Sequence, residues 1–521
     1  MRRKHTCLCL MMLVLPFLTV RVPAQSGAPG ATGLLELPSA EKERILESFE
    51  VWEAAPTRAP LPARVVNTRY LPKVSSQGQL GICGSFAVYY YLYSYYFAKA
   101  RNLAFRPDPA TSPQHVFSPA WGVLMAPHAV KAEDSGFYMP WGASPLASIE
   151  SISNFGALPW SEMPYSDDKD KPTADKFYRQ LPTAAQMKAA LRYKGVRGIT
   201  LNAINTPNGL QNLKCFLSQG NIAVASWSSP LTTNFDSYPT PTEYVNIDGI
   251  GQVGNVNNQV YAWPSQAGGR TDPHAVNIVG YDDNISYRNK SGEECRGALL
   301  IVNSWGTDWG VSPAAGIEAG FMWLGYEAVL LCGRLDGQAY AMAARAEDYQ
   351  PLLLGTVTLQ DLTANNWVTQ FAGSPMRWPS GLTYSANGFP LGGAFPSNRY
   401  TTKSNTAQPD HVEYLLDLSS MAGNPFPVLT FKCTLASSGS VGKISGLEVE
   451  RRELEGGVWK ESRSAVPEVD FTVRGFNDLY PIFSADINML QERDIGLGEL
   501  HPQAGSSAWG DANGDGFPDL A

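Results

Sequence analysis

The sequence predicts a mixed α+β protein with more than one domain, and three observations support this prediction. The 521 residues exceed what one hydrophobic core usually holds, so roughly two to four domains are expected. Helix-type patterns occur at 88–101, 143–155 and 211–218, and strand-type runs follow them. Beyond about residue 345 the pattern changes to short alternating strands with turn signals. A helical first half and a strand-rich second half are typical of an α+β domain.

The N-terminal region has the order of features found in exported proteins. A basic start is followed by an apolar run of about fifteen residues and a small residue at Ala24, which predicts a signal peptide over 1–24. This run is too short for a comfortable membrane span, and no later segment is long enough. We therefore expect a secreted, periplasmic or extracellular protein without a membrane span. Residues 25–61 are rich in Gly, Ala and Pro around one amphipathic stretch, which predicts a linker or a short pro-segment.

Strand signals divide the remainder of the chain in two. Between residues 62 and 345, strands are predicted at 222–227, 274–281 and 298–302, and the last of these, ALLIV, is apolar throughout and expected to be buried on both faces. Residues 346–495 contain alternating runs such as LTFKCTL and VDFTV, and a Gly456–Gly457 turn predicts a hairpin. We interpret this second region as a β-sandwich-like accessory domain.

Charge and cysteine content narrow the function classes. The net charge of −8 and the lack of a basic patch argue against nucleic acid as a partner. Five cysteines follow the predicted signal peptide, which is an odd number in an export context where thiols tend to pair. They are Cys83, Cys215, Cys295, Cys332 and Cys433. One thiol is left over, and the sequence does not choose among the three pairings of the other four.

Cys83 lies in the stretch QGQLGICGSFA, where a glycine-rich loop ends and a helix is expected to begin. A thiol attacks only as thiolate, and both a helix N-terminus and a neighbouring imidazolium favour the anion. The stretch DPHAVNIVGYDD places His274 at the head of a strand. Asn303 follows the apolar ALLIV strand, where its amide is expected to hold the imidazole in one tautomer. Trp305 is expected to shield that hydrogen bond from water.

With these residues the chain resembles the papain-type cysteine peptidases, the C1 family, over about 62–345. That family runs Gln, Cys, His, Asn in chain order, here Gln77, Cys83, His274 and Asn303, and the block NSWGTDWG at 303–310 is its most specific motif in this chain. The resemblance implies a helical and a barrel-like lobe with a cleft between them. It also implies Cys83 as nucleophile, His274 as general base and then acid, and Asn303 as its orienting residue. Gln77 would form the oxyanion hole with the Cys83 backbone N–H.

The chain departs from the family pattern near the nucleophile. The half-cystine common three residues before the nucleophile is Leu80, and the usual aromatic residue after it is Gly84. The spacing from Cys83 to His274 predicts insertions near 225–270, and the long inhibitory pro-segment of many relatives is missing. A polypeptide substrate is expected, and no cofactor is needed for this chemistry.

Other interpretations stay open for several residues and for the function. Cys83 alone would more often be a buried structural cysteine, and His128, in the similar MAPHAV, competes with His274 although no strand signal follows it. His115 is expected to be structural. The alternative function is an adhesion or binding protein on a catalytically silent peptidase-like scaffold, and transpeptidation would use the same residues. The accessory domain is expected to bind a surface, a carbohydrate or a protein.

The last segment, residues 496–521, contains WGDANGDGFPDLA, which places oxygen ligands at Asp511, Asn513, Asp515 and Asp519. Alternating oxygen side chains around glycines suit Ca²⁺, but an EF-hand loop would need a glutamate at its twelfth position and the chain has none there. The segment instead resembles the start of a VCBS or FG-GAP repeat, as in integrin-like propellers, a motif that binds calcium. A flexible acidic tail is the alternative.

Overall fold

The computed structural model describes most of the first 360 residues and, beyond them, mainly strands. The described residues are 33–54, 60–126, 128–132, 138–167, 176–179, 182–227, 244–246, 259–261, 274–289, 292–307, 319–330, 335–360, 367–373, 384–385, 411–417, 419, 428–435, 441–455, 458–466, 469–472, 480–486, 509–510 and 519–520. They form both helices and sheets, with more residues in strands than in helices, which confirms the mixed composition expected from the sequence.

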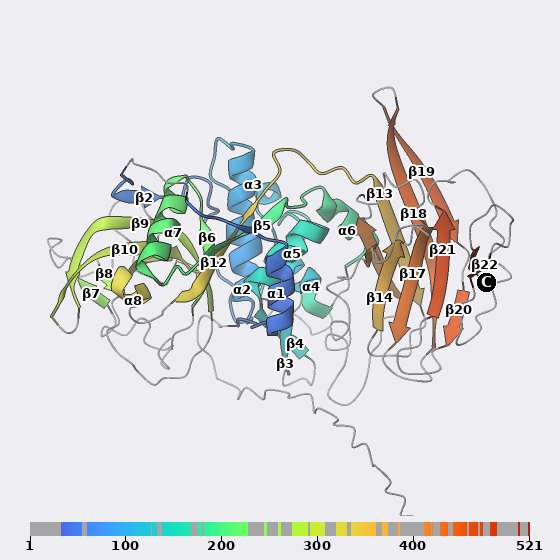
Figure 1. The fold of residues 1–521 in the computed structure, drawn as a ribbon, viewed down its shortest axis with the longest axis horizontal. Helices are drawn as coiled ribbons and strands as arrows, with labels where there is room; N and C mark the ends of the chain where they lie inside the picture. The colour runs from blue at the N-terminus through green and yellow to red at the C-terminus, as the bar shows by residue number, and fades with distance from the viewer. Residues whose placement is uncertain are drawn as a thin grey trace, which may run out of the picture.

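A continuous helical run stands in the middle of the molecule, between strands on one side and further helices on the other (Figure 1). It consists of α2 (Cys83–Ser85), the π-helix η1 (Phe86–Tyr93) and α3 (Ser94–Ala100). The helix predicted at 88–101 therefore begins five residues earlier, at the cysteine itself. Every side chain of η1 is buried, so this is a core helix, as its aromatic residues on all sides indicate.

The tyrosines of this run use their hydroxyl groups to hold other segments. The hydroxyl of Tyr90 donates to the carbonyl of Lys73 at 2.7 Å, Tyr95 donates to Gly220 at 2.7 Å, and Tyr96 donates to Ile222 at 2.6 Å. A buried phenol needs such a partner, because an unpaired hydroxyl inside the protein is costly. The central run thereby fixes loops from several parts of the chain.

The remaining helices pack partly against the central run and partly against the sheets. They are α1 (Ser39–Glu47), η2 (Pro113–His115), α4 (Pro119–Met125), α5 (Pro145–Phe155), η4 (Phe177–Arg179), α6 (Ala184–Leu191), α7 (Pro207–Ser218) and α8 (Tyr326–Leu330). The predicted helix at 143–155 corresponds to α5, which Ser144 caps and which ends before Gly156 at φ 75°. The helix predicted at 211–218 begins earlier, at Pro207, because Thr206 caps it and proline fits the first helical position.

A ten-stranded sheet collects most strands of the first 345 residues. Its order is β1-β5-β12-β6-β9-β10-β11-β8-β7, with β2 paired to β9. The strands are β1 (Glu50–Val51), β2 (Arg64–Val66), β5 (Arg197–Asn202), β6 (Ala223–Trp227), β7 (Tyr244–Asn246), β8 (Gln259–Tyr261), β9 (His274–Arg288), β10 (Glu294–Val302), β11 (Phe321–Gly325) and β12 (Leu335–Ala343). The three strands predicted here correspond to β6, β9 and β10. All side chains of 298–302 are buried, as expected.

Two antiparallel sheets are built from the residues after 350 and gather at one end of the molecule (Figure 1). One has the order β16-β13-β18-β19 with β20 on β18, and the other β15-β14-β17-β21. Their strands are β13 (Leu353–Gln360), β14 (Trp367–Gly373), β15 (Tyr384–Ser385), β16 (His411–Asp417), β17 (Val428–Leu435), β18 (Val441–Glu455), β19 (Val458–Val466), β20 (Val469–Thr472) and β21 (Tyr480–Asp486). The predicted hairpin is present, since Glu455 pairs with Val458. The division into a peptidase and an accessory domain stays a prediction.

Helix α6 joins these strands to the helical part. Its Lys188 forms an ion pair with Glu450 of β18 at 2.6 Å, and Lys194, just beyond the helix, pairs with Asp417 of β16. Met187, Leu353 and Leu415 are buried between them, and the sulfur of Met187 accepts from the Leu415 N–H. This junction thus combines apolar packing with ion pairs whose carboxylates are buried.

A short antiparallel pair of strands and the free thiols bear on further predictions from the sequence. Strands β3 (His128–Ala132) and β4 (Tyr138–Ala143) pair with each other, so the expectation of no strand after His128 is wrong. Cys215 and Cys295 are free thiols, whereas the side chains of Cys332 and Cys433 lie outside the described residues, as does the predicted signal peptide. Within the described part of the chain, no helix is long and apolar enough to cross a membrane.

The Asp417–Lys194 pair provides a test of this junction. The Asp417 side chain is 3% exposed, and burial alone would raise its pKa, but Lys194 together with hydrogen bonds to Ser419 and Tyr349 holds the pKa below its usual value. Asp417→Ala leaves the Lys194 charge largely buried without its partner, so we expect it to lower the free energy of unfolding by about 3 kcal/mol. Urea denaturation measures this loss. The matched control is Glu294→Ala, which removes the exposed Arg288–Glu294 pair and is expected to change stability by less than about 0.5 kcal/mol. Equal losses in both variants would contradict a role for the buried pair.

Candidate active site

Cys83 begins the central helical run and is completely buried. Its sulfur donates a hydrogen bond to the carbonyl oxygen of Gly33 at 3.0 Å. The backbone of Ala275, the residue after His274, also hydrogen-bonds to this sulfur. The structure therefore brings the start of the helix and the start of β9 together, although 191 positions separate Cys83 from His274 in the sequence.

His274 is held by two neighbours that follow β10. Its Nε2 lies 2.7 Å from Oδ1 of Asn303, and its ring stacks on Trp305 with 4.7 Å between ring centroids. Because an amide oxygen can only accept, Nε2 carries the proton and Nδ1 is the basic nitrogen. Nδ1 is buried and has no hydrogen-bond partner within the residues that the structure describes. Nδ1 is thus the ring nitrogen at which the imidazole can bind a further proton.

Gln77 is buried and is held against the loop of Asn303. The Gln77 N–H donates to the carbonyl of Ser304 at 2.8 Å, while the Ser304 hydroxyl donates to Oε1 of Gln77 at 2.5 Å. The Gln77 Nε2 donates one hydrogen bond to the Leu80 carbonyl at 2.9 Å. These contacts orient the carboxamide with its oxygen towards Ser304 and its NH₂ group towards the loop that leads to Cys83.

Both titratable groups are neutral in this arrangement. Burial raises the pKa of Cys83 to about 11, against the smaller opposing effect of nearby backbone groups. Burial also lowers the pKa of His274 to about 4, and the hydrogen bond to Asn303 opposes this only in part. At neutral pH Cys83 is therefore a thiol and His274 a neutral imidazole, and these two residues do not form a thiolate–imidazolium pair.

The segment that begins at Gly33 covers the thiol. The Gly33 carbonyl accepts from the Cys83 sulfur and from the Ala143 N–H at 3.2 Å, and the Leu35 N–H donates to the Ala143 carbonyl at 3.2 Å. Leu34 and Leu37 pack on the hydrophobic core. Residues 33–37, named here the covering segment, thus run along the end of β4 beside the thiol.

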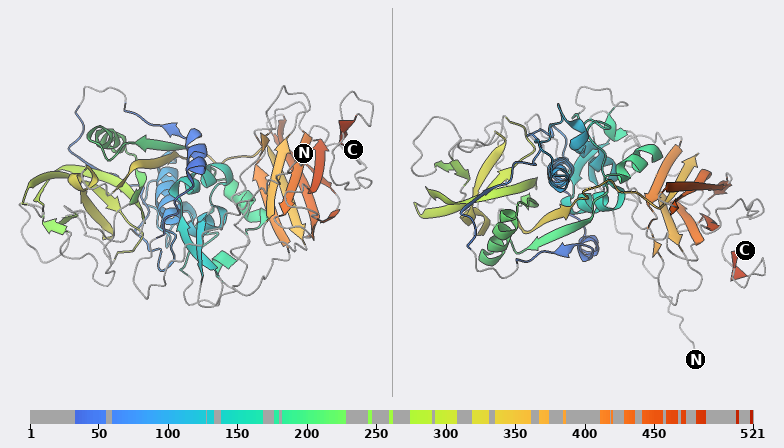
Figure 2. Two further views of the ribbon diagram at one scale, coloured as in Figure 1. Left: turned by 60° about the horizontal axis from the view of Figure 1, so that its bottom comes forward. Right: turned by 90° about the horizontal axis from the view of Figure 1, so that it is seen from above.

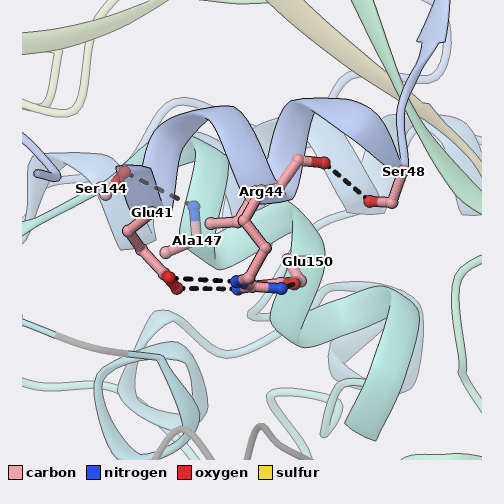
Figure 3. Close-up of polar contacts among 7 residues, drawn as sticks. Glu41, Arg44, Ser48, Ser144, Ala147 and Glu150 are labelled. Atoms are coloured by element: carbon pink, nitrogen blue, oxygen red, sulfur yellow. Dashed lines mark hydrogen bonds and ion pairs between the residues drawn. The ribbon is translucent and has the colours of Figure 1, made fainter. Parts of the chain in front are cut away.

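Helix α1 anchors the covering segment from its C-terminal side. Arg44 pairs with Glu41 of the same helix and with Glu150 of α5 at 2.8 Å (Figure 3). Ile45 is completely buried, and β1 joins the edge of the ten-stranded sheet by pairing with β5. Figure 2 gives two further views, in which this N-terminal helix and strand, drawn in blue, lie against the rest of the fold. Residues 39–51 are therefore part of the packed structure. The interpretation of 25–61 as a linker or a short pro-segment stays a prediction.

Three residues that contact the site have no distinguishing signal in the sequence. Ser304 belongs to the NSWG block, but only the structure shows that its hydroxyl holds Gln77. Tyr91 lies in a tyrosine-rich helix with no signal to distinguish it, yet its hydroxyl accepts from the Ser75 N–H at 3.1 Å and donates to the Asn303 carbonyl at 3.0 Å. Gly33 gives no signal because its contact with Cys83 spans 50 residues.

Other predicted site residues lie apart from this cluster or beyond the description. The backbones of Trp509–Gly510 (β22) and Asp519–Leu520 (β23) pair, which brings the two ends of the predicted calcium loop together. Asp511, Asn513 and Asp515 lie outside the described residues, and so does the side chain of Asp519. The side chain of His128 is likewise not described, whereas His115 packs against Phe97 and Phe105.

Comparisons with known proteins give limited similarity. No protein-family model and no curated protein matches the chain. Among solved structures, the chain is similar to a digestive procathepsin L 3 of Tenebrio molitor larval midgut, with 15% identity, a TM-score of 0.34, and coverage of 58% of this chain and 79% of that chain. It is also similar to a procathepsin B S9 from Trypanosoma congolense, with 12% identity, a TM-score of 0.33, and coverage of 61% and 84%. Both scores are low, and a functional assignment has to come from the site itself.

The low pKa of His274 predicts a specific loss of stability in acid. The unfolded chain binds a proton on this histidine near pH 6.5, whereas the folded protein does so only near pH 4. Between these values the unfolded state holds more protons, so stability falls as the pH is lowered, by up to about 3 kcal/mol. Urea midpoints measured from pH 7.5 to 4.5 should fall more steeply for the wild type than for His274→Gln. Parallel curves would show that His274 is not buried in its neutral form.

Proposed function

We propose that the chain is a secreted papain-like cysteine endopeptidase that hydrolyses peptide bonds through Cys83, His274 and Asn303. The observation that supports this most directly is the orientation of His274. Asn303 occupies its Nε2, Trp305 covers one face of its ring, and the basic Nδ1 has no other partner within the described residues. The adjacent backbone of Ala275 contacts the thiol. A base and a nucleophile in this relation are the requirement for acyl transfer.

The proposed reaction conserves protons through His274. The Cys83 thiol gives its proton to Nδ1 as sulfur bonds to the substrate carbonyl carbon. The peptide C–N bond then breaks, and the imidazolium returns the proton to the leaving amine, which leaves a thioester. Water gives a proton to Nδ1 and hydroxide to the acyl carbon, the S–C bond breaks, and the thiol regains its proton. The Gln77 carboxamide and the Cys83 N–H are proposed to stabilise the oxyanion.

The state with Gly33 on the thiol is proposed to be latent. The Gly33 carbonyl accepts a hydrogen bond from sulfur, so its oxygen points at the nucleophile and not at the proposed oxyanion donors. In addition, burial keeps both reactive groups neutral, and the covering segment is proposed to contribute to that burial at the thiol. Displacement of this segment would admit solvent and substrate, and it would restore the pKa values that reaction requires.

The rest of the chain is proposed to serve this peptidase. We propose a domain boundary near residue 345, with 346–495 as a β-sandwich-like accessory domain that binds a surface, a carbohydrate or a protein. The tail at 496–521 is proposed as a partial VCBS/FG-GAP-like calcium site. Since α6 and its ion pairs hold the strands of this region against the helices, such a domain would present a bound partner in a fixed orientation.

Cleavage of an unstructured protein tests the proposed function. We expect casein to be cut under mild reductant by the chain from Gln25 onward, and Cys83→Ala to reduce the rate at least about a thousandfold, because no other group supplies the nucleophile. Product analysis by mass spectrometry distinguishes hydrolysis from transpeptidation. Cys215→Ala is the matched control, since Cys215 is a buried free thiol away from this site. If the wild type cuts nothing and a thiol-directed epoxide does not label Cys83, the silent-scaffold alternative is favoured.

Removal of the covering segment tests the latent state. A chain that starts at Pro38 lacks residues 25–37 but keeps α1 and β1, whose Ile45 and neighbouring Phe49 are buried. We expect epoxide labelling of Cys83 to be at least about tenfold faster in this chain, because the thiol no longer has to wait for a local opening. The rate of labelling is followed by mass spectrometry of the Cys83 peptide. Unchanged labelling would mean that these residues do not limit access.

A further inference from the structure

The residue that lies against the thiol in this structure is a glycine, and its surroundings leave no space for a side chain. A Cβ atom built on Gly33 would lie 2.3 Å from the carbonyl oxygen of Gly81, 2.5 Å from its carbonyl carbon and 2.6 Å from its Cα. All three are backbone atoms, which cannot move aside as the end of a flexible side chain can. Gly33 itself is buried.

On the side away from Gly81, the chain at Gly33 is held by the end of β4. Ala143 holds the covering segment through the hydrogen bonds to Gly33 and Leu35. Ala143 in turn lies against the first turn of the central helix, because a Cβ on Gly84 would lie 2.1 Å from the Ala143 carbonyl oxygen. The chain at Gly33 is therefore confined between the backbone of Gly81 and the end of β4.

Gly81 and Gly84, on either side of Cys83, together account for the narrow space around Gly33. Gly84 allows the end of β4 to approach the helix, and Gly81 presents bare backbone to the chain beside the thiol. Overpacking against backbone of this kind is strongly unfavourable, since neither side can relax without moving the helix start or β4. We name the space between Gly81 and Ala143 the glycine slot.

We propose that the glycine slot makes the peptidase selective for glycine at the residue whose carbonyl group reaches Cys83, with apolar residues such as leucine beside it. The proposal rests on the peptidase function proposed above. The Gly33 carbonyl oxygen lies 3.0 Å from the sulfur. A substrate residue that brings its carbonyl carbon to the thiol turns its oxygen to the proposed oxyanion donors, but its Cα still has to enter the narrow space beside Gly81. Leu34, the next residue, is partly buried against the core, which indicates an apolar neighbour.

The first test compares peptides that differ in a single residue. Peptides with Leu on both sides of a central Gly, Ala, Phe or Arg are incubated with the full chain, and kcat/KM is determined for each, with the cleaved bond identified by mass spectrometry. We expect cleavage after Gly at least about tenfold faster than after Ala, and slower still for Phe and Arg. The covering segment lowers the apparent rate for all peptides by the same fraction, so the ratio is unaffected.

The outcomes separate the slot from the peptidase function. If casein is cut but Gly, Ala, Phe and Arg peptides react equally, the glycine slot is refuted and the peptidase proposal stands. If neither casein nor any peptide is cut, the peptidase proposal fails and the selectivity falls with it. Cleavage after Gly alone or with strong preference supports the slot.

A second test uses the covering segment itself and needs no catalysis. Gly33→Ala places a methyl group where the Gly81 backbone lies, so we expect it to displace the segment and to speed epoxide labelling of Cys83 at least about fivefold. The control is Glu36→Ala in the same segment, where the side chain is exposed and no change is expected. Equal labelling of wild type and Gly33→Ala would refute the steric basis of the slot.

Discussion

The site depends on a junction between two loops that are far apart in the sequence. Backbone hydrogen bonds from Gln77 to Ser304 and from Gly306 to Ser75 join the loops in a short antiparallel contact, and 227 residues separate Gln77 from Ser304. The hydroxyl of Tyr91 connects the same two loops to the central helix. Gln77, the proposed oxyanion-hole residue, belongs to this junction, and His274, the proposed base, is bonded to Asn303 beside it. A shift of the junction would therefore move Gln77 and Asn303 together, while Cys83 stays with the helix.

Burial and reactivity oppose each other at this site. The same packing that excludes water from Cys83 and His274 holds both groups neutral, and a neutral thiol is a poor nucleophile. Gly33 supplies the hydrogen-bond acceptor that a buried thiol lacks otherwise, so the covered state is satisfied without any charge. In the proposed active state both effects would be reversed, because solvent and substrate would stabilise the charged forms.

The sequence predicted the elements better than the contacts between them. The strands at 274–281 and 298–302 and the helix ending at Gly156 follow from local periodicity and capping, which act over a few residues. The contact of His274 with Asn303 was expected from the chemistry of an amide that follows a buried strand, and the family resemblance implied it too, but no local signal fixes a contact between residues 29 positions apart. The π-helical winding of 86–93 was not predicted. The bonds from its tyrosine hydroxyls to distant carbonyls, such as that of Lys73, are likewise not specified by the local sequence. The accessory strands were predicted by alternation, but their attachment to α6 depends on long-range pairs such as Lys194–Asp417.

The departure at Gly84 and the glycine at position 33 have a common physical origin. An aromatic residue after the nucleophile would keep the end of β4 away from the helix, whereas Gly84 lets the Ala143 carbonyl approach to a distance that excludes any Cβ. That approach narrows the space beside Gly81, and only a residue without a side chain then fits next to Cys83. The glycines of QGQLGICGSFA therefore do more than bend the loop into the helix. They set the width of the space in which the thiol meets a peptide carbonyl, and the covering segment meets that requirement with its own glycine.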